Sequence, residues 1–202
     1  MKKNIAVFAS GTGSNFSAIN QAVKTGVLKG ACLKLLVCDN PEALVLEKAA
    51  KAEVKILLAE RKNFSSQEAF ENEIIRHLKD DRIDLVVLAG FMRILSDSFV
   101  RAYRNRIINI HPSLLPSFKG GHGIKDAFDY GVKLTGVTVH FVDEEMDHGP
   151  IILQSAIEIK RADTLASLEK KIHQAEHKIY PQAIKLFLSG KLKVNGRKVK
   201  TL

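Results

Sequence analysis

The sequence predicts an α/β fold, with a mostly parallel, twisted sheet flanked by helices and a small β-hairpin at the C-terminus. Short apolar runs alternate with stretches whose apolar residues recur at helical spacing, as in a parallel sheet with crossover helices. A glycine-rich turn follows the first run, and near the end Asn195-Gly196 separates two short alternating runs, which is a strong hairpin signal. The 202 residues suit one sizeable domain over residues 1–190, followed by a basic hairpin or tail over residues 191–202.

The first half of the chain supplies four of the expected strands and three helices. The strands are expected at residues 4–9, 33–38, 54–58 and 83–89, the last of them continuously apolar as a central parallel strand should be. One helix should run from the glycine turn to about Lys24, and another should begin with Asn40 as cap and Pro41 as its first residue. A third should start at Ser65 or Ser66 and continue through about Leu78.

The second half changes character. A short strand at residues 107–111 ends in polar groups, and longer strands are expected at residues 137–142 and 151–159. The longest helix should run from Thr164 to about Leu188.

Charge and hydrophobicity exclude several function classes. The net charge is +9, but residues 191–202 hold five basic residues and no acid, so the rest of the chain carries only +4. No aromatic residue lies among those basic residues, which argues against a nucleic-acid platform. The longest apolar run, Leu85 to Met92, is too short to span a bilayer, and the N-terminus lacks the pattern of a signal peptide. We therefore expect a cytoplasmic protein, a monomer or homodimer, that acts on small molecules.

The turn from Gly11 to Asn15 is a candidate phosphate cradle, because it joins a strand to the N-terminus of a helix. Gly13 lets the backbone approach a ligand, and Ser14 and Asn15 add side-chain donors. Phe16 stands where the dinucleotide fingerprint needs a third glycine, and the lysine of a P-loop is absent as well. From the turn alone, a tight turn with a polar cap remains an equal alternative.

Asn109 and His111 form the most informative pair. They lie two apart in a strand and therefore point to the same face, and Pro112 holds His111 in an extended conformation. Downstream, an acidic turn that includes Asp147 is closed by Gly149-Pro150. Taken singly, each of the three polar residues is more easily explained as a cap or a packing residue; their combination favours catalysis.

At this point the chain resembles the folate-dependent formyltransferases, whose Rossmann-like fold agrees with the expected one. The matching runs recur in the family's order and are residues 8–15, 88–95, 109–116, 136–142, 146–154 and 176–181. The opening glycine turn and the Glu-His-x-x-Tyr-Pro stretch are most similar to the members that formylate 5-phosphoribosylglycinamide in purine (IMP) biosynthesis.

The resemblance implies a reaction and its catalytic residues. An amine of the glycinamide ribonucleotide attacks the formyl carbon of the co-substrate 10-formyltetrahydrofolate, with no metal or redox cofactor. Asn109 and a protonated His111 stabilise the negative oxygen, and Asp147 supports His111 and helps to move a proton. His122 matches a histidine near the formyl end and ranks below these three.

The resemblance also implies substrate contacts. For the ribonucleotide, Gly13, Ser14 and Asn15 hold the phosphate, and His173 and Glu176 hold the ribose and amide. For the folate, the implied contacts are Gln67, Met92, Arg93, Ile94, Leu95, Asn109, Asp143, Glu144, Glu145 and Met146.

One position departs from the family. Some members carry an arginine where this chain has Gln67, and that arginine faces the anionic glutamate tail of the folate. Gln67 cannot supply the charge, so Arg61 and Lys62 of the same loop are the candidates to compensate.

Three other functions compete with this one. A formyltetrahydrofolate hydrolase would use the same residues with water as nucleophile, although such relatives carry an N-terminal regulatory domain, and here the first strand begins at residue 4. The tRNA formyltransferases add a large C-terminal RNA-binding domain, which residues 191–202 are too short to form. A non-enzymatic nucleotide-binding module would explain the glycine turn but would leave the other three residues without a role.

Overall fold

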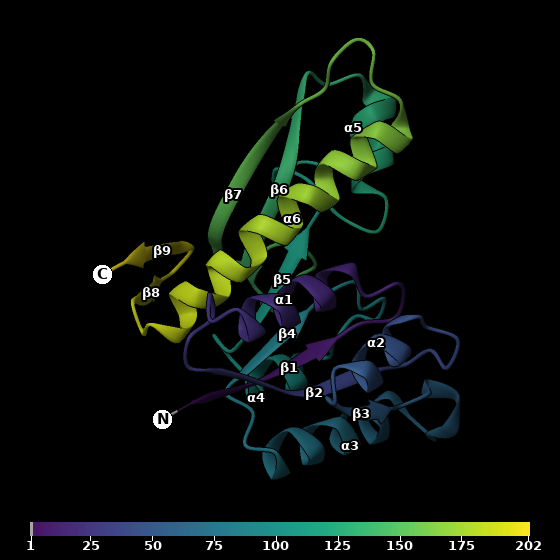
Figure 1. Cartoon of the computed structure of the whole chain (residues 1–202), viewed down its shortest axis with the longest axis vertical. Coiled ribbons are helices and arrows are strands. Elements are labelled where there is room, and N and C mark those ends of the chain that lie inside the picture. Colours follow the sequence, from purple (N-terminus) through teal and green to yellow (C-terminus); the bar gives the residue numbers. More distant parts are fainter. Residues whose placement is uncertain (1) are drawn as a thin grey trace. The chain divides into compact units, whose positions relative to one another are not determined.

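The computed structural model describes residues 2–202. They divide into two compact units, with the boundary along the chain between Ile108 and Asn109. In Figure 1, the first unit runs from the purple strand β1 to the teal strand β5, and the second continues to the yellow hairpin at the C-terminus.

The first unit contains a parallel sheet with the strand order β3-β2-β1-β4. Its central strand is buried throughout the stretch from Ile5 to Phe8, which explains the uninterrupted apolar run in the sequence. The strands are β1 (Lys3–Phe8), β2 (Ala31–Cys38), β3 (Lys55–Leu58) and β4 (Leu85–Leu88).

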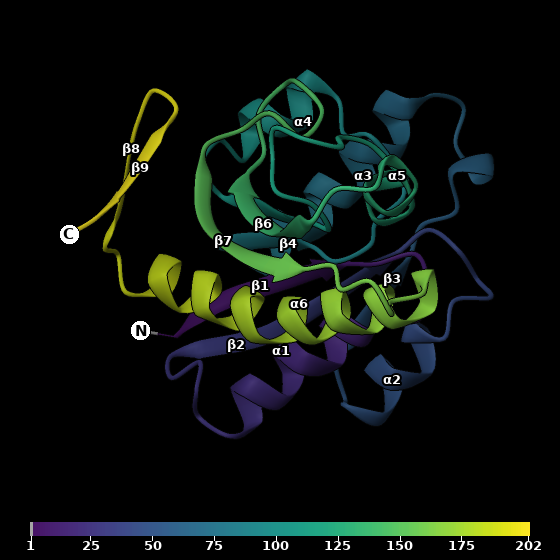
Figure 2. The ribbon, with the colours of Figure 1, turned by 90° about the horizontal axis from the view of Figure 1, so that it is seen from above.

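Helices cover both faces of this sheet. In Figure 2, α1 and α2 lie on one side of it and α3 and α4 on the other. The helical elements of the unit are α1 (Ser14–Lys24), α2 (Val45–Lys51), a 3-10 turn η1 (Arg61–Asn63), α3 (Gln67–Asp80) and α4 (Asp97–Ala102). The Ser66 side chain caps α3 by accepting from the backbone N–H of Ala69 at 3.0 Å, as the sequence predicts.

The strand order creates a topological switch point beside β1. The chain proceeds from β1 outward through β2 to β3 and then returns to place β4 on the other side of β1. Ligands of open parallel sheets bind where the order reverses, outside the carboxyl ends of the strands. The loops that follow β1 and β4 therefore occupy the expected binding position of this unit.

The helix expected to begin at Pro41 begins later, so that prediction was wrong. α2 starts at Val45, after a turn in which Asn40 accepts from the backbone N–H of Glu42 at 3.1 Å. The Val45 N–H donates to the carbonyl of Gly11 at 3.1 Å, which ties the start of the helix to the glycine turn. A contact between residues so far apart in sequence overrides the local capping signal.

The second unit is built on an antiparallel pair and one long helix. Strand β5 (Ile107–His111) crosses from the first unit into the second, where β6 (Leu134–Phe141) pairs with β7 (Ile151–Glu158). The long helix α6 (Leu165–Leu188) packs on β6 and β7 and also contacts α5 (Gly123–Tyr130). Thr164 and Ser167 form a capping box at the start of α6, where the sequence places the helix start.

The C-terminal hairpin is present, with β8 (Leu192–Asn195) antiparallel to β9 (Lys198–Thr201). Asn195 pairs with Lys198, so the turn residues are Gly196 and Arg197 rather than the Asn195-Gly196 that the sequence suggests. Gly196 has φ +57, which suits a glycine at the first turn position. The hairpin joins the edge of β7 through the parallel pair Ile151 and Lys198.

These observations confirm the predicted fold class, since most strand pairs are parallel, helices flank the strands and a hairpin ends the chain. The proposed boundary at residue 190 stays a prediction; it falls between the end of α6 and the start of β8. Among residues 2–202, no helix combines the length and the hydrophobicity that crossing a membrane requires.

Candidate active site

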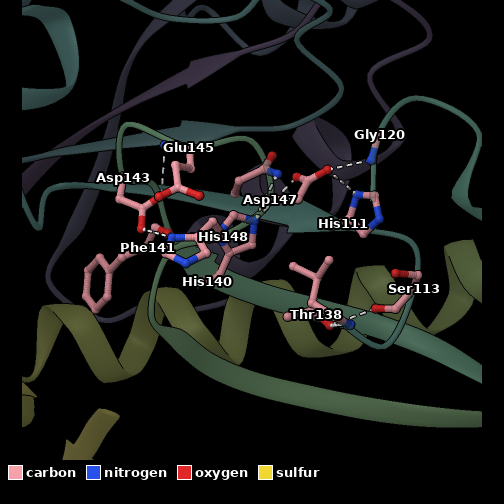
Figure 3. Close-up of polar contacts among 12 residues, drawn as sticks. His111, Ser113, Gly120, Thr138, His140, Phe141, Asp143, Glu145, Asp147 and His148 are labelled. Carbon is pink, nitrogen blue, oxygen red and sulfur yellow. Dashed lines mark hydrogen bonds and ion pairs between the residues drawn. The ribbon is translucent and has the colours of Figure 1, made fainter. Parts of the chain in front are cut away.

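Strand β5 delivers Asn109 and His111 to one polar cluster in the second unit. The strand is buried except at Asn109, which is partly exposed, and His111 is only 4% exposed. The Asn109 Nδ2 lies 3.2 Å from the His140 Nε2, and the His111 Nδ1 lies 3.4 Å from the Asp147 Oδ2. In Figure 3, the Asp147 carboxylate lies between the rings of His111 and His140.

Asp147 lies in the loop between β6 and β7 and has a left-handed backbone with φ +48. Such a conformation is uncommon for a residue with a side chain and costs about 1–3 kcal/mol, so the surrounding structure must hold it. The carboxylate Oδ2 accepts from the backbone N–H of Gly120 at 2.8 Å, and the side chain is only 10% exposed. The loop thus presents a nearly buried carboxylate to both histidines.

The His111 ring lies between two acceptors. Its Nε2 is 2.7 Å from the carbonyl oxygen of Phe118, which can only accept, so Nε2 carries a hydrogen. Its Nδ1 faces the Asp147 carboxylate, also an acceptor. A protonated ring would satisfy both partners, so the geometry suits the cationic form of His111.

His140 completes the cluster in its neutral form. Its Nδ1 donates to the Phe141 carbonyl at 2.8 Å, which leaves Nε2 to accept from the Asn109 amide. Burial lowers the pKa of His140, although the Phe141 hydrogen bond and the Asp147 charge oppose that effect. The neutral ring therefore holds the Asn109 carboxamide and leaves its second N–H available.

The residues of the predicted phosphate cradle lie in the first unit, at the switch point. Gly13 has φ +70 and directly precedes α1, and no acidic residue lies in the first turn of that helix. Its missing side chain has a packing reason, because a Cβ there would lie 2.4 Å from the Val45 Cγ2. Asn15 is buried and Ser14 is partly exposed. No carboxylate in the first turn therefore opposes an anion at the N-terminus of α1.

The predicted folate wall, Met92 to Leu95, follows β4 at the same switch point. Ser10 links it to the glycine turn, since its N–H donates to the Gly90 carbonyl at 3.0 Å and its hydroxyl accepts from the Met92 N–H at 3.1 Å. Met92 and Ile94 are 75% and 68% exposed, whereas Leu95 is buried. Two large exposed apolar side chains beside a polar turn are typical of a ligand surface.

The exposed side chain of Arg93 is held by two partners. Its Nε lies 2.5 Å from the Oδ2 of Asp39, whose side chain is 8% exposed, and its guanidinium covers the Phe70 ring. The same Asp39 accepts from the Ser10 hydroxyl at 2.6 Å. Asp39 therefore connects the glycine turn to the loop that carries Arg93.

Gln67 makes two hydrogen bonds that the sequence does not suggest. Its amide donates to the Ile94 carbonyl and to Glu71, each at 3.1 Å. The proposed compensating residues are engaged as well, since Arg61 donates to the Phe64 carbonyl at 2.8 Å and Lys62 pairs with Glu60 at 2.8 Å. The Glu60 contact raises the pKa of Lys62. Lys62 is thus paired with Glu60, although its side chain stays 76% exposed.

The remaining predicted residues lie in the second unit. Asp143 accepts from the Glu145 N–H at 3.2 Å, and Met146 is 55% exposed in the same loop as Asp147. On α6, the His173 Nδ1 lies 2.9 Å from the carboxylate of Glu176, which is buried, and this hydrogen bond raises the pKa of His173. His122 is exposed at the residue before α5.

Comparison with known proteins gives the family. The formyl transferase family model matches residues 3–184. The chain belongs to the formyl transferase family.

Individual family members agree over most of the chain. The phosphoribosylglycinamide formyltransferase of Bacillus subtilis (strain 168) is 49% identical over 92% of this chain and 95% of its own length. The trifunctional purine biosynthetic protein adenosine-3 of Drosophila melanogaster is 44% identical over 94% of this chain, which spans only 14% of that protein. The crystal structure of glycinamide ribonucleotide transformylase 1 from Symbiobacterium toebii superposes with a TM-score of 0.96 at 40% identity, covering 100% of this chain and 94% of that one.

The structure brings Asn109, His111 and Asp147 together as the sequence predicts, and it adds members that were missed. These are His140, the Phe118 carbonyl and the Gly120 N–H. A signal for His140 was present, because Thr138 and His140 are alternate polar residues in the otherwise apolar stretch of residues 137–142 and so share a face. The family match includes this whole cluster but ends before the C-terminal hairpin.

Proposed function

We propose that this chain transfers the formyl group of 10-formyltetrahydrofolate to the amine of 5-phosphoribosylglycinamide, in de novo purine (IMP) biosynthesis. The observation that carries the proposal is the convergence of Asn109, His111 and Asp147 in one nearly buried cluster. The 49% identity to a phosphoribosylglycinamide formyltransferase supports the choice of substrates. The products are formylglycinamide ribonucleotide and tetrahydrofolate.

The reaction exchanges one carbon–nitrogen bond for another. The amine nitrogen bonds to the formyl carbon, the bond from that carbon to the folate N10 breaks, and one proton passes from the amine to N10. The formyl carbon keeps its oxidation level, so the reaction needs no redox cofactor. Within residues 2–202, no three His, Cys, Asp or Glu side chains gather as a metal site.

Asn109 and His111 stabilise the tetrahedral intermediate, in which the formyl oxygen becomes negative. One N–H of the Asn109 amide is held by His140, and the other is free to donate to that oxygen. The Nε2–H of His111 donates to the Phe118 carbonyl in the free chain. Exchange of this carbonyl for the formyl oxygen brings a charged donor to the developing negative charge.

Asp147 supports the cation on His111 and moves the proton. Its Oδ2 faces the His111 ring and accepts from Gly120, while its Oδ1 lies 3.8 Å from His140. A carboxylate has further lone pairs for a water, and through that water it can take the amine proton and deliver it to N10.

The chain would act in the cytoplasm on small molecules, as a monomer or homodimer.

A turnover assay tests the proposal. We expect equimolar formylglycinamide ribonucleotide and tetrahydrofolate when both substrates are present, measured by mass spectrometry and by the absorbance change of the folate. Free formate produced at the same rate without the ribonucleotide would identify a formyltetrahydrofolate hydrolase instead. Binding of the ribonucleotide with no turnover would support a non-enzymatic nucleotide-binding module.

Gln67→Arg should tighten the binding of the folate's glutamate tail. A new charged hydrogen bond at this exposed position is worth about 1 kcal/mol, or several-fold in affinity. The gain should shrink as the salt concentration rises, because exposed charges are screened. Titration of the variant with 10-formyltetrahydrofolate measures the effect.

Two controls separate charge from loop order at this position. Gln67→Met removes the hydrogen bonds to Ile94 and Glu71 without adding charge, so it reports what those bonds contribute. A folate analogue without its glutamate should bind the arginine variant no more tightly than the parent chain. An equal gain with that analogue would show that residue 67 acts on the loop and not on the tail.

A further inference from the structure

The turn of the C-terminal hairpin places an arginine beside the loop that carries Asp147. Because Asn195 pairs with Lys198, Arg197 stands at the turn, one residue before the strand that meets β7. One guanidinium nitrogen of Arg197 lies 2.5 Å from the His148 Nε2, and another donates to the His148 carbonyl at 2.7 Å. One side chain of the hairpin thus holds both the ring and the backbone of His148.

The contacts of Arg197 determine how His148 is protonated. Arginine can only donate, so the His148 Nε2 accepts and the ring hydrogen is on Nδ1. That Nδ1 lies 2.8 Å from the Asp143 carboxylate and donates to it. A continuous chain of hydrogen bonds therefore runs from the guanidinium of Arg197 through the His148 ring to Asp143.

This chain of contacts closes the loop of residues 143–149 at both ends. Asp143 stands at the start of the loop and His148 near its end, and the His148 ring bridges them, as Figure 3 shows. At the same end, Gly149 lies so close to β6 that a Cβ would be 1.8 Å from the Phe141 carbonyl oxygen. The carbonyl that Arg197 holds belongs to His148, which directly follows Asp147, the residue with the strained backbone.

We propose that Arg197 is a positioning residue, which clamps the loop of residues 143–149 through His148 and so keeps the Asp147 carboxylate at His111. The inference rests on the catalytic role of Asp147 in the proposed function. It gives the basic hairpin a task that does not depend on its net charge. Of the residues that form the clamp, Arg197 lies outside residues 3–184, the part matched by the family model, whereas His148 and Asp143 lie inside it.

Arg197→Met tests the clamp, because methionine keeps much of the length of the side chain and removes every donor. We expect kcat to fall about tenfold, since displacement of a catalytic group by about 1 Å can cost up to about a hundredfold. The KM for the ribonucleotide should change less than twofold. Arg197→Lys, which can reach only one acceptor at a time, should recover part of the loss.

Lys200→Met is the matched control, because it removes the same charge from the same hairpin at an exposed position. We expect its kcat and its melting temperature to match those of the parent chain. Equal kcat values for the Arg197→Met and Lys200→Met variants would overturn the proposal. A fall in kcat that Arg197→Lys does not relieve at all would do so too.

A double substitution checks that Arg197 acts through His148. If it does, adding Arg197→Met to His148→Ala should lower kcat less than Arg197→Met does alone, because His148→Ala has already removed the ring contact and leaves Arg197 only the backbone carbonyl. Fully additive losses would contradict the proposal.

Amide hydrogen exchange tests the clamp without any substrate. Residues 143–149 should exchange faster in Arg197→Met than in Lys200→Met or the parent chain. Unchanged exchange overturns the clamp, and faster exchange with an unchanged kcat overturns its positioning role. Should the parent chain show no turnover, the proposed function fails, and hydrogen exchange still decides whether the clamp exists.

Discussion

Replacement of His111 by alanine should lower kcat by roughly two to four orders of magnitude, the usual range for a lost acid–base group. The substitution removes the ring between Phe118 and Asp147 and, with it, the charged donor to the developing oxyanion. Substrate affinities should change little, because the lost interaction forms mainly in the transition state. Steady-state kinetics with each substrate varied in turn measures both quantities.

The matched control is His77→Ala. His77 also contacts a carboxylate, Glu73 at 3.1 Å, but it lies on α3 in the first unit. Its kcat should equal that of the parent chain, while the melting temperatures of both variants exclude a loss of folded protein. A kcat for His111→Ala within a few-fold of the parent value would remove His111 from the mechanism.

The sequence predicts the strands of the first unit well for a physical reason. Strands buried on both faces are continuously apolar; β4 is buried throughout, and β1 is buried from Ile5 to Phe8. Two short helices, α4 and α5, were not anticipated, since neither is long enough to establish a helical period. The Ser96 cap of α4 and the left-handed Gly131 after α5 were available as signals.

Residues of the site were predictable where local geometry decides and not where distant segments meet. Asn109 and His111 share a face because they are alternate residues of one strand. The partner of Asn109, His140, is 31 residues away, and Arg197 is 49 residues from His148. The register of the hairpin decides where the Arg197 side chain points, because a shift of one residue would turn it to the other face. The Asn-Gly signal predicted a different turn and therefore a different register.

Gly13→Val should affect both folding and ribonucleotide binding. The residue has φ +70, where a side chain is strained, and a Cβ would lie 2.4 Å from the Val45 Cγ2 and 2.7 Å from its Cβ. Backbone strain and overpacking each cost about 1–3 kcal/mol, so the free energy of unfolding should fall by roughly 2–6 kcal/mol. Denaturant unfolding measures this change.

Gly11→Ala is the control for the stability effect. No atom lies within 4 Å of the position of its Cβ, so the same turn should accept a methyl group there with a change in unfolding free energy below about 0.5 kcal/mol. A loss at Gly11 as large as the loss at Gly13 would show that the turn tolerates no side chain anywhere, and that Val45 does not explain the effect.

Because Gly13→Val also destabilises the chain, a test of the phosphate site must separate the fraction of folded variant from the affinity of the folded variant for the ribonucleotide. At a temperature where the variant is folded, we expect weaker binding of the ribonucleotide and unchanged binding of the folate, because the valine side chain would obstruct close approach of an anion to the start of α1. Val45→Ala removes the side chain that packs against Gly13 but keeps the glycine at position 13. It therefore destabilises the chain without placing an obstruction at the start of α1. Isothermal titration of both variants with both substrates gives the comparison. If Val45→Ala weakens ribonucleotide binding as much as Gly13→Val does, disorder of the turn accounts for the loss. If Gly13→Val weakens the binding of both substrates equally, the turn is not the phosphate site.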